Sequence, residues 1–128
     1  MDDHSPDNGV AQRRELIKLT PLPHPRHDAV VTLTTVRNGI SVRLRYVPDR
    51  DVIAPKSLET YLESAFRSVD GPLLAKAQTV LEDINDQAIP CWLEILLVQT
   101  DGGLEEKACV EEKQPRWQDP GILARLEP

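Results

Sequence analysis

The dipeptide Asn38-Gly39 constrains the fold of this chain more strongly than any other feature. It separates two runs rich in β-branched residues within 29–47, and Asn-Gly between such runs favours a β-hairpin with a two-residue loop. One face of the hairpin is then largely apolar, with the predicted pairs Thr35 and Val42, Leu33 and Leu44, and Val31 and Tyr46. The opposite face is mixed and partly cationic because it carries Arg43 and Arg45.

A second hairpin is predicted near the other end of the chain. The apolar-rich run 91–100 is followed by Asp101-Gly102-Gly103, which turns the chain back into 104–112. With Gly102-Gly103 as the loop, the predicted pairs are Ile95 and Val110, Leu97 and Ala108, Glu94 and Glu111, Leu96 and Cys109, and Val98 and Lys107.

Two amphipathic helices are predicted between the hairpins. The first, 57–68, has one apolar face that comprises Leu58, Tyr61, Leu62, Ala65, Phe66 and Val69. Pro55 lies just ahead of it, and Ser57 is expected to cap its first turn. Asp70-Gly71-Pro72 interrupts the chain and starts the second helix. The apolar face of this helix comprises Leu73, Ala77, Val80, Leu81 and Ile84, and its polar face comprises Lys76, Gln78, Glu82 and Asp83.

The order of these elements predicts an α+β fold, ββααββ, with a four-stranded antiparallel sheet and two helices on one face. The second sheet face is too polar for a core and too apolar to remain fully hydrated. Closure of several subunits into a ring would cover this face and remove the sheet edges, so a homo-oligomeric barrel is expected. The domain is expected to span 21–112, between a flexible tail at 1–20 and a proline-broken tail at 113–128.

Composition supports assembly and excludes several functional classes. The chain has 128 residues, of which two are Trp, two Tyr and one Phe, and small domains with few large core residues often bury surface against other subunits. A net charge of −6 without a basic run argues against binding to nucleic acid, and no apolar run has membrane-spanning length.

The cysteines and histidines bear on location and on metal binding. Cys91 and Cys109 do not form a disulfide framework, so a cytoplasmic location is expected. His24 and His27 have no third partner, so no metal site is predicted.

The stretch 46–69 resembles a known enzyme family. Its tyrosine-valine-proline-aspartate start, its Lys56-Ser57-Leu58 and its Tyr61-Leu62 ahead of Phe66 are similar to the NADPH-dependent 7-cyano-7-deazaguanine reductases of the queuosine pathway. The resemblance covers most of 19–110 and implies the tunnelling fold, a ring of such domains. It agrees with the architecture expected from the hydrophobic pattern.

The resemblance also implies where the family's chemistry is absent. In that family a cysteine thiolate adds to the nitrile and an aspartate handles the proton, both from a loop between the first two strands. Here Arg37 runs directly into Asn38-Gly39, so both catalytic side chains are absent and no catalytic residue is assigned. The cysteine cannot be replaced by another residue, because no other side chain combines a thiolate's nucleophilicity with so low a pKa. The family's substrate-binding histidine and glutamate correspond to Leu73 and Leu74.

The family's cofactor motif is partly retained. By resemblance, Lys56, Ser57 and Tyr61 are candidate cofactor-binding residues, for NADPH if the family activity is kept. The motif's glutamate is Ala54 here and its second lysine is Glu59, and an anion at that position repels the cofactor phosphates. No bound cofactor is therefore expected.

The second sheet face supplies the remaining candidates, because it carries most of the charged side chains of the predicted sheet. The candidate ligand-binding residues are Arg43, Arg45, Glu94, Lys107 and Glu111. The alternative for the two arginines is ion pairing with Glu94 and Glu111, which otherwise face each other as like charges. Both cysteines are expected to be inert packing residues, although Cys109 lies on the face that would line the channel.

Two hypotheses for function follow. The first is a homologue of the reductase that has lost nitrile reduction and acts as an oligomeric ligand-binding or scaffold protein, or as a partner subunit of a catalytic paralogue. The second is a divergent NADPH-dependent reductase or other tunnelling-fold enzyme for a deazaguanine, purine or pterin-like substrate, whose acid–base groups would be Arg43, Glu94, Lys107 or Glu111 at subunit interfaces. The missing loop favours the first hypothesis, and the retained Lys56-Ser57 favours the second.

Overall fold

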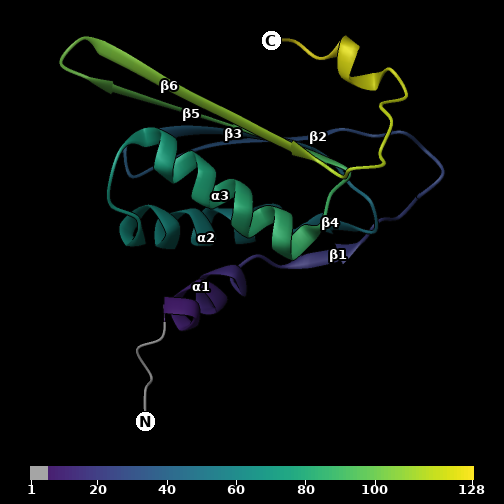
Figure 1. Ribbon diagram of the computed structural model, residues 1–128, viewed down its shortest axis with the longest axis horizontal. Helices are drawn as coiled ribbons and strands as arrows, with labels where there is room; N and C mark the ends of the chain where they lie inside the picture. The colour runs from purple at the N-terminus through teal and green to yellow at the C-terminus, as the bar shows by residue number, and fades with distance from the viewer. Residues whose placement is uncertain (1–5) are drawn as a thin grey trace.

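A computed structural model describes residues 6–128 of the chain. The three α-helices lie on one side of a long antiparallel sheet (Figure 1), so the predicted α+β class and the ββααββ order are confirmed. The elements are α1 Pro6–Arg14, β1 Leu19–Pro21, β2 Val31–Arg37, β3 Ile40–Val47, β4 Asp51–Ile53, α2 Pro55–Ser68, α3 Leu73–Ala88, β5 Trp92–Asp101, β6 Leu104–Lys113 and the 3-10 helix η1 Ile122–Arg125. No described helix is long and apolar enough to cross a lipid bilayer.

The main sheet has the strand order β2-β3-β5-β6, with every neighbouring pair antiparallel. The register of both hairpins is the predicted one. Asn38 and Gly39 have φ values of 53° and 75°, which is the left-handed backbone that a two-residue hairpin turn requires. Arg37 pairs directly with Ile40, so nothing is inserted between β2 and β3.

Helices α2 and α3 cover one face of this sheet and enclose the core. All but one of the predicted apolar positions of α2 are buried, and so are the sheet residues Val42, Leu44, Leu93, Ile95 and Leu97.

The start of α2 differs from the prediction. The helix begins at Pro55 with Ala54 as its N-cap, so Ser57 lies in the first turn. Its hydroxyl donates to the Ala54 carbonyl at 2.7 Å instead of capping the helix.

The N-terminal part is more ordered than predicted. Residues 1–5 of the expected tail lie outside the described residues, but α1 and β1 follow them, and β1 pairs with β4 in a second small sheet. Helix α1 is fixed by Arg13 and Arg14, which bind Asp83 of α3. The prediction that Asp83 lies on the solvent face of its helix is therefore wrong: this residue is 1% exposed.

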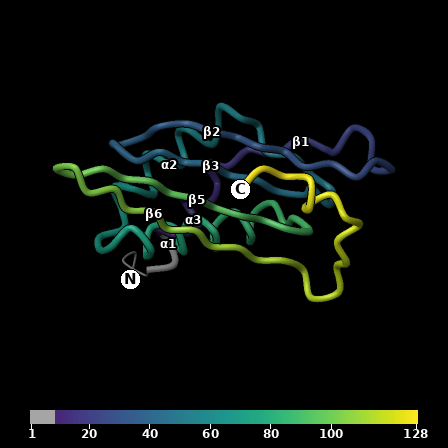
Figure 2. The backbone as a smooth tube through the Cα atoms, turned by 90° about the horizontal axis from the view of Figure 1, so that it is seen from above, coloured from purple at the N-terminus to yellow at the C-terminus, as the bar shows by residue number. Residues whose placement is uncertain are grey.

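The C-terminal segment, residues 114–128, has no regular structure except η1. It leaves β6 and folds back over the sheet face that α2 and α3 do not cover, which we call the outer face. Both views place its end above the middle of the sheet (Figures 1 and 2). The predicted proline-broken tail is thus a segment with a defined path.

Candidate ligand site on the outer sheet face

Three charged side chains meet at the centre of the outer face, and we call them the arginine cluster. Arg43 and Arg45 come from β3 and Glu94 from β5, where the strand register sets Arg45 opposite Glu94. Glu94 Oε1 accepts hydrogen bonds from Arg45 Nε at 2.7 Å and from Arg43 Nη2 at 3.2 Å. Arg45 is 8% exposed, so its charge is shielded from bulk water and its pairing is stronger than that of a surface ion pair.

Two main-chain oxygens of the C-terminal segment complete the contacts of this cluster. Arg45 Nη1 donates to the carbonyl of Glu127 at 2.5 Å, and Arg43 Nη1 donates to an oxygen of Pro128 at 3.1 Å. Each guanidinium group therefore has a carboxylate on one side and an oxygen acceptor on the other. Groups with this geometry recognise carboxylates and phosphates.

The predicted ligand-binding residues do not all converge. Arg43, Arg45 and Glu94 come together, and the predicted pairing of the arginines with Glu94 is confirmed. Pairing with Glu111 does not form, because Glu111 accepts a 2.9 Å hydrogen bond from the indole of Trp92. Lys107 is exposed further along β6, where its Nζ lies 3.8 Å from Glu105.

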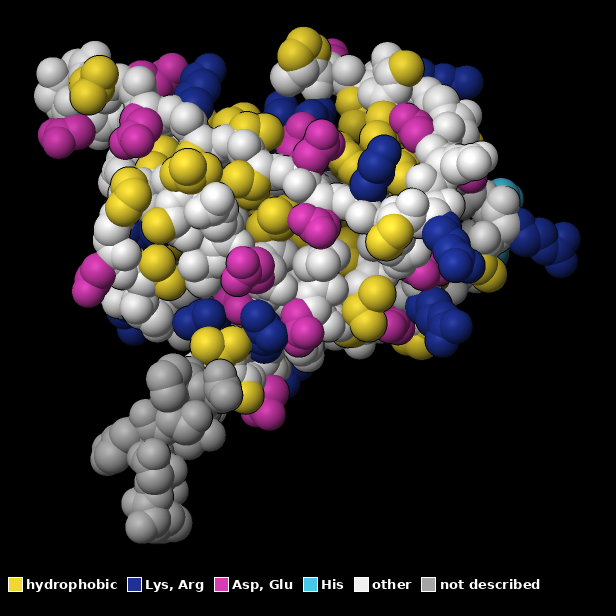
Figure 3. Space-filling model, in the orientation of Figure 1, with side chains coloured by type: hydrophobic (Ala, Val, Ile, Leu, Met, Phe, Trp, Pro, Cys, Tyr) yellow, Lys and Arg dark blue, Asp and Glu magenta, His cyan; other side chains and the backbone are white. Residues whose placement is uncertain are grey.

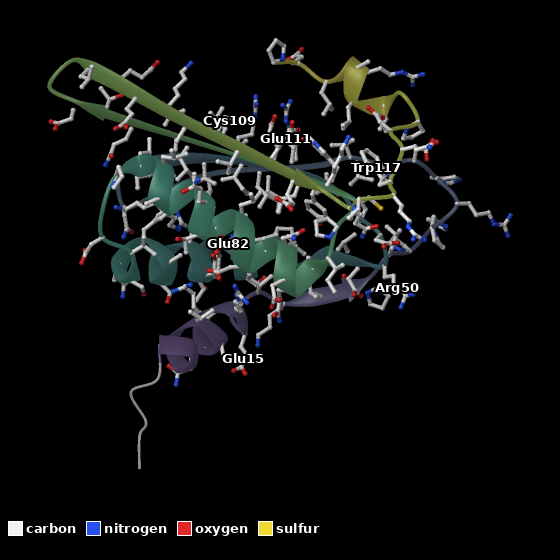
Figure 4. The ribbon with its side chains drawn as sticks, in the orientation of Figure 1. Glu15, Arg50, Glu82, Cys109, Glu111 and Trp117 are labelled. Atoms are coloured by element: carbon white, nitrogen blue, oxygen red, sulfur yellow. The ribbon has the colours of Figure 1, made fainter. Side chains whose placement is uncertain are left out.

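A hollow of about 480 Å³ lies beside the arginine cluster, between the outer face and the C-terminal segment. Trp92 and Glu111 line it from the sheet, and Trp117 and Leu123 line it from the segment. Figure 4 shows Glu111 on β6 with Trp117 at the start of the segment. The sequence indicates that Trp117 and Leu123 of the proline-broken tail are available for docking, and the structure places both over the outer face.

Neither cysteine is an activated nucleophile. Burial raises the pKa of the Cys109 thiol, and the nearby Glu94 carboxylate raises it further. Burial also raises the pKa of Cys91, with a smaller contribution from Asp49. The expectation that Cys109 is a buried packing residue is wrong because the residue is exposed, although its thiol is partly shielded from water. Both thiols are free.

The three candidate cofactor residues do not share one surface. The Lys56 side chain is 96% exposed and its Nζ lies 3.5 Å from Glu59. The same Glu59 carboxylate pairs with Arg37. Ser57 bonds to backbone at the start of α2, and Tyr61 is fully buried with its hydroxyl against Asp83. The Tyr61 side chain is therefore a core element.

The structure also places the positions of the family's substrate-binding pair and the two histidines. Leu73 is buried and Leu74 is 47% exposed, and neither can hydrogen-bond a purine edge. His24 and His27 are exposed on the surface as predicted, and no metal-binding group of three or more side chains occurs in residues 6–128. Lysine, arginine and acidic side chains are interspersed on the face shown in Figure 3, without a continuous cationic track.

The comparisons with known proteins agree with the fold. No family model matches the chain. Two curated NADPH-dependent 7-cyano-7-deazaguanine reductases, from two strains of Acidithiobacillus ferrooxidans, are 30% identical to it over 116 residues, which cover 81% of this chain and 82% of each relative. The apo structure of the archaeosine synthase QueF-Like superposes with a TM-score of 0.51 at 16% identity, covering 73% of this chain and 91% of that chain. This chain therefore belongs to the NADPH-dependent 7-cyano-7-deazaguanine reductase family.

Proposed function

We propose that this chain is a family member that does not reduce nitriles and that acts as an oligomeric ligand-binding protein related to the queuosine and archaeosine pathways. The tight β2–β3 hairpin carries this proposal. Its turn is only Asn38-Gly39, at the place where the family has the loop with its catalytic cysteine and aspartate. The two hairpin strands remain in register up to the turn, so those groups have no equivalent there.

The two thiols of the chain do not replace the missing nucleophile. Cys109 pairs across the sheet with Leu96, and Cys91 lies just before β5. Since the pKa of each thiol is raised, each is protonated near neutral pH. A protonated thiol attacks a nitrile poorly.

The residues at the cofactor motif do not fit NADPH. Glu59 pairs with both Lys56 and Arg37, so a carboxylate lies between the cations nearest the motif and repels the cofactor phosphates. Tyr61 is buried and has no surface to offer a nicotinamide.

The outer edges of the main sheet support assembly. Strands β2 and β6 each have one neighbour within the described chain, and unpaired edges of this length commonly pair with further chains. A ring of copies, or of this chain with a catalytic paralogue, would pair these edges. The arginine cluster is the proposed ligand site of such an assembly.

The proposal is tested by mixing the protein with 7-cyano-7-deazaguanine and measuring its intact mass, with NADPH oxidation followed in parallel. No covalent adduct and no oxidation are expected, whereas an Acidithiobacillus ferrooxidans reductase run alongside should show both. An adduct that disappears in Cys109→Ala would overturn the proposal. It would support the second candidate, a divergent reductase with its nucleophile on β6.

A further inference from the structure

We infer that the arginine cluster binds a small organic oxyanion, a carboxylate or a phosphate, and that the C-terminal segment occupies this site until the oxyanion displaces it. The inference rests on the ligand-binding role proposed above. It adds the chemical class of the ligand and an intramolecular competitor.

The charges of the cluster favour an anion over the present acceptors. Two guanidinium groups share a single carboxylate, that of Glu94. The other two acceptors are main-chain oxygens of the C-terminal segment. An anion would add a Coulombic attraction to both guanidinium groups that the neutral Glu127 carbonyl does not supply. Glu111, the facing acid on β6, makes no ion pair with either arginine, and its carboxylate accepts a hydrogen bond from Trp92.

One hydrogen-bond donor of the arginine cluster also lacks an acceptor. Arg43 Nε is buried and has no hydrogen-bond partner among the described residues, which is costly for a charged group. Arg43 also borders a second hollow of about 320 Å³ on the outer face, where Thr34, Leu96 and Val98 are among the lining residues. An oxyanion with a small apolar body would supply the missing acceptor and fill this mainly apolar hollow.

The C-terminal segment is held loosely enough to be displaced. Between β6 and its end it contains one four-residue 3-10 helix and makes no strand pairing, so few backbone hydrogen bonds oppose its release. Its apolar contacts are Trp117 and Leu123, which line the hollow over Trp92. Release would move Trp117 away from Trp92, and these are the only two tryptophans of the chain.

The experiment is a titration of the full chain with inorganic phosphate and, separately, with benzoate, followed by the two indole N–H resonances. Both probes should shift the Trp117 resonance toward its position in an unstructured chain, and a larger response to benzoate would assign the apolar hollow to the ligand. Leu123→Ala removes one anchor of the segment and should tighten binding about fivefold, since the competent state becomes more populated. Arg43→Gln should abolish the response, and Arg67→Gln, an equal charge change at an exposed position of α2, should not alter it.

Several results would overturn the inference. These are the absence of any response in both wild type and Leu123→Ala, unchanged affinity in Leu123→Ala, or a full response in Arg43→Gln. A response abolished equally by Arg67→Gln would show only general charge attraction and would also reject the site. A nitrile adduct would reject the proposed loss of catalysis but would leave these titrations unaffected, so the two failures are distinguishable.

Discussion

The hydroxyl of Tyr61 donates a 2.5 Å hydrogen bond to Asp83 Oδ2 inside the protein, where both residues are at most 1% exposed. Arg13 Nε contacts the same carboxylate oxygen at 2.6 Å, and Arg14 Nε contacts the other at 2.8 Å. One aspartate thus joins α1, α2 and α3. The retained tyrosine of the cofactor motif serves this junction.

Asp83→Asn should lower the free energy of unfolding by about 3–5 kcal/mol, because it leaves the partly buried Arg13 without a counter-charge and Arg14 with only the exposed Asp86. Urea denaturation would measure the loss, and amide exchange should show α1 released first. Glu82→Gln is the matched control: this neighbour on α3 is exposed, so its change should stay within about 0.5 kcal/mol. Equal effects of the two substitutions would contradict the central role of Asp83.

The protein should lose stability in alkali through its two buried tyrosines. Burial raises the pKa of Tyr61 far above its ordinary value of 10.0, and burial also raises that of Tyr46. The unfolded chain releases these protons at lower pH than the folded chain does. The stabilisation is therefore complete below about pH 10 and declines above it, by about 1.4 kcal/mol per pH unit for each tyrosine.

Urea unfolding at a series of alkaline pH values measures this slope. Tyr46→Phe removes one of the two groups and should reduce the slope by about half. A slope in the wild type no steeper than that of the variant would show that Tyr46 ionises freely in the folded protein.

Phe66→Ala should cost about 3–5 kcal/mol of unfolding free energy, as expected for a large-to-small change in a packed core. Phe66 is 6% exposed and belongs to the buried face of α2. Leu74→Ala, at a half-exposed position of α3, provides the comparison and should cost about 1 kcal/mol or less. A similar loss at both positions would contradict the packing of α2 on the sheet.

The reactivity of Cys109 should depend on Glu94. In a Cys91→Ser background, labelling of Cys109 by a disulfide reagent should be slow at neutral pH and accelerate in alkali, because burial and Glu94 raise the pKa of the thiol. Glu94→Gln removes one of these causes while Arg43 and Arg45, which lower the pKa, remain. Labelling near neutral pH should then become faster, and a slower rate would contradict the assigned electrostatics.

Assembly is tested directly by light scattering. The free edges of β2 and β6 predict a closed oligomer whose mass is a fixed multiple of the 14.4 kDa chain. A stable monomer at micromolar concentration would contradict the ring. The titration of the arginine cluster would then need to be interpreted for a single chain.

The fold was predictable where its determinants are local. Asn38-Gly39 and Gly102-Gly103 set the two hairpin registers, and helical spacing identified the buried faces of α2 and α3. Helix α1 was missed because it has no apolar stripe and its anchor lies 70 residues away. Asp83 follows the core residue Val80 by three positions, so its place at the border of the apolar face was a usable signal.

The candidate site was predictable only in part, because some of its contacts join segments that lie far apart in the sequence. The alternation of side chains along each strand placed Arg43, Arg45 and Glu94 on one face of the predicted sheet, which is a local property. The β3–β5 register that sets Arg45 opposite Glu94 was not predicted. The return of Glu127 and Pro128 to the arginines depends on a path through 114–128. No periodic pattern in the sequence encodes such a path.

The distance in sequence between α1 and its anchor also sets an order of events during synthesis. The ribosome makes α1 before α2 and α3, but a nine-residue helix without a partner is unstable in water. Its counter-charge arrives 70 residues later, on α3, and α3 must itself be packed against α2 before Asp83 is in place. Helix α1 is therefore translated before α2 and α3 but secured only after both of them.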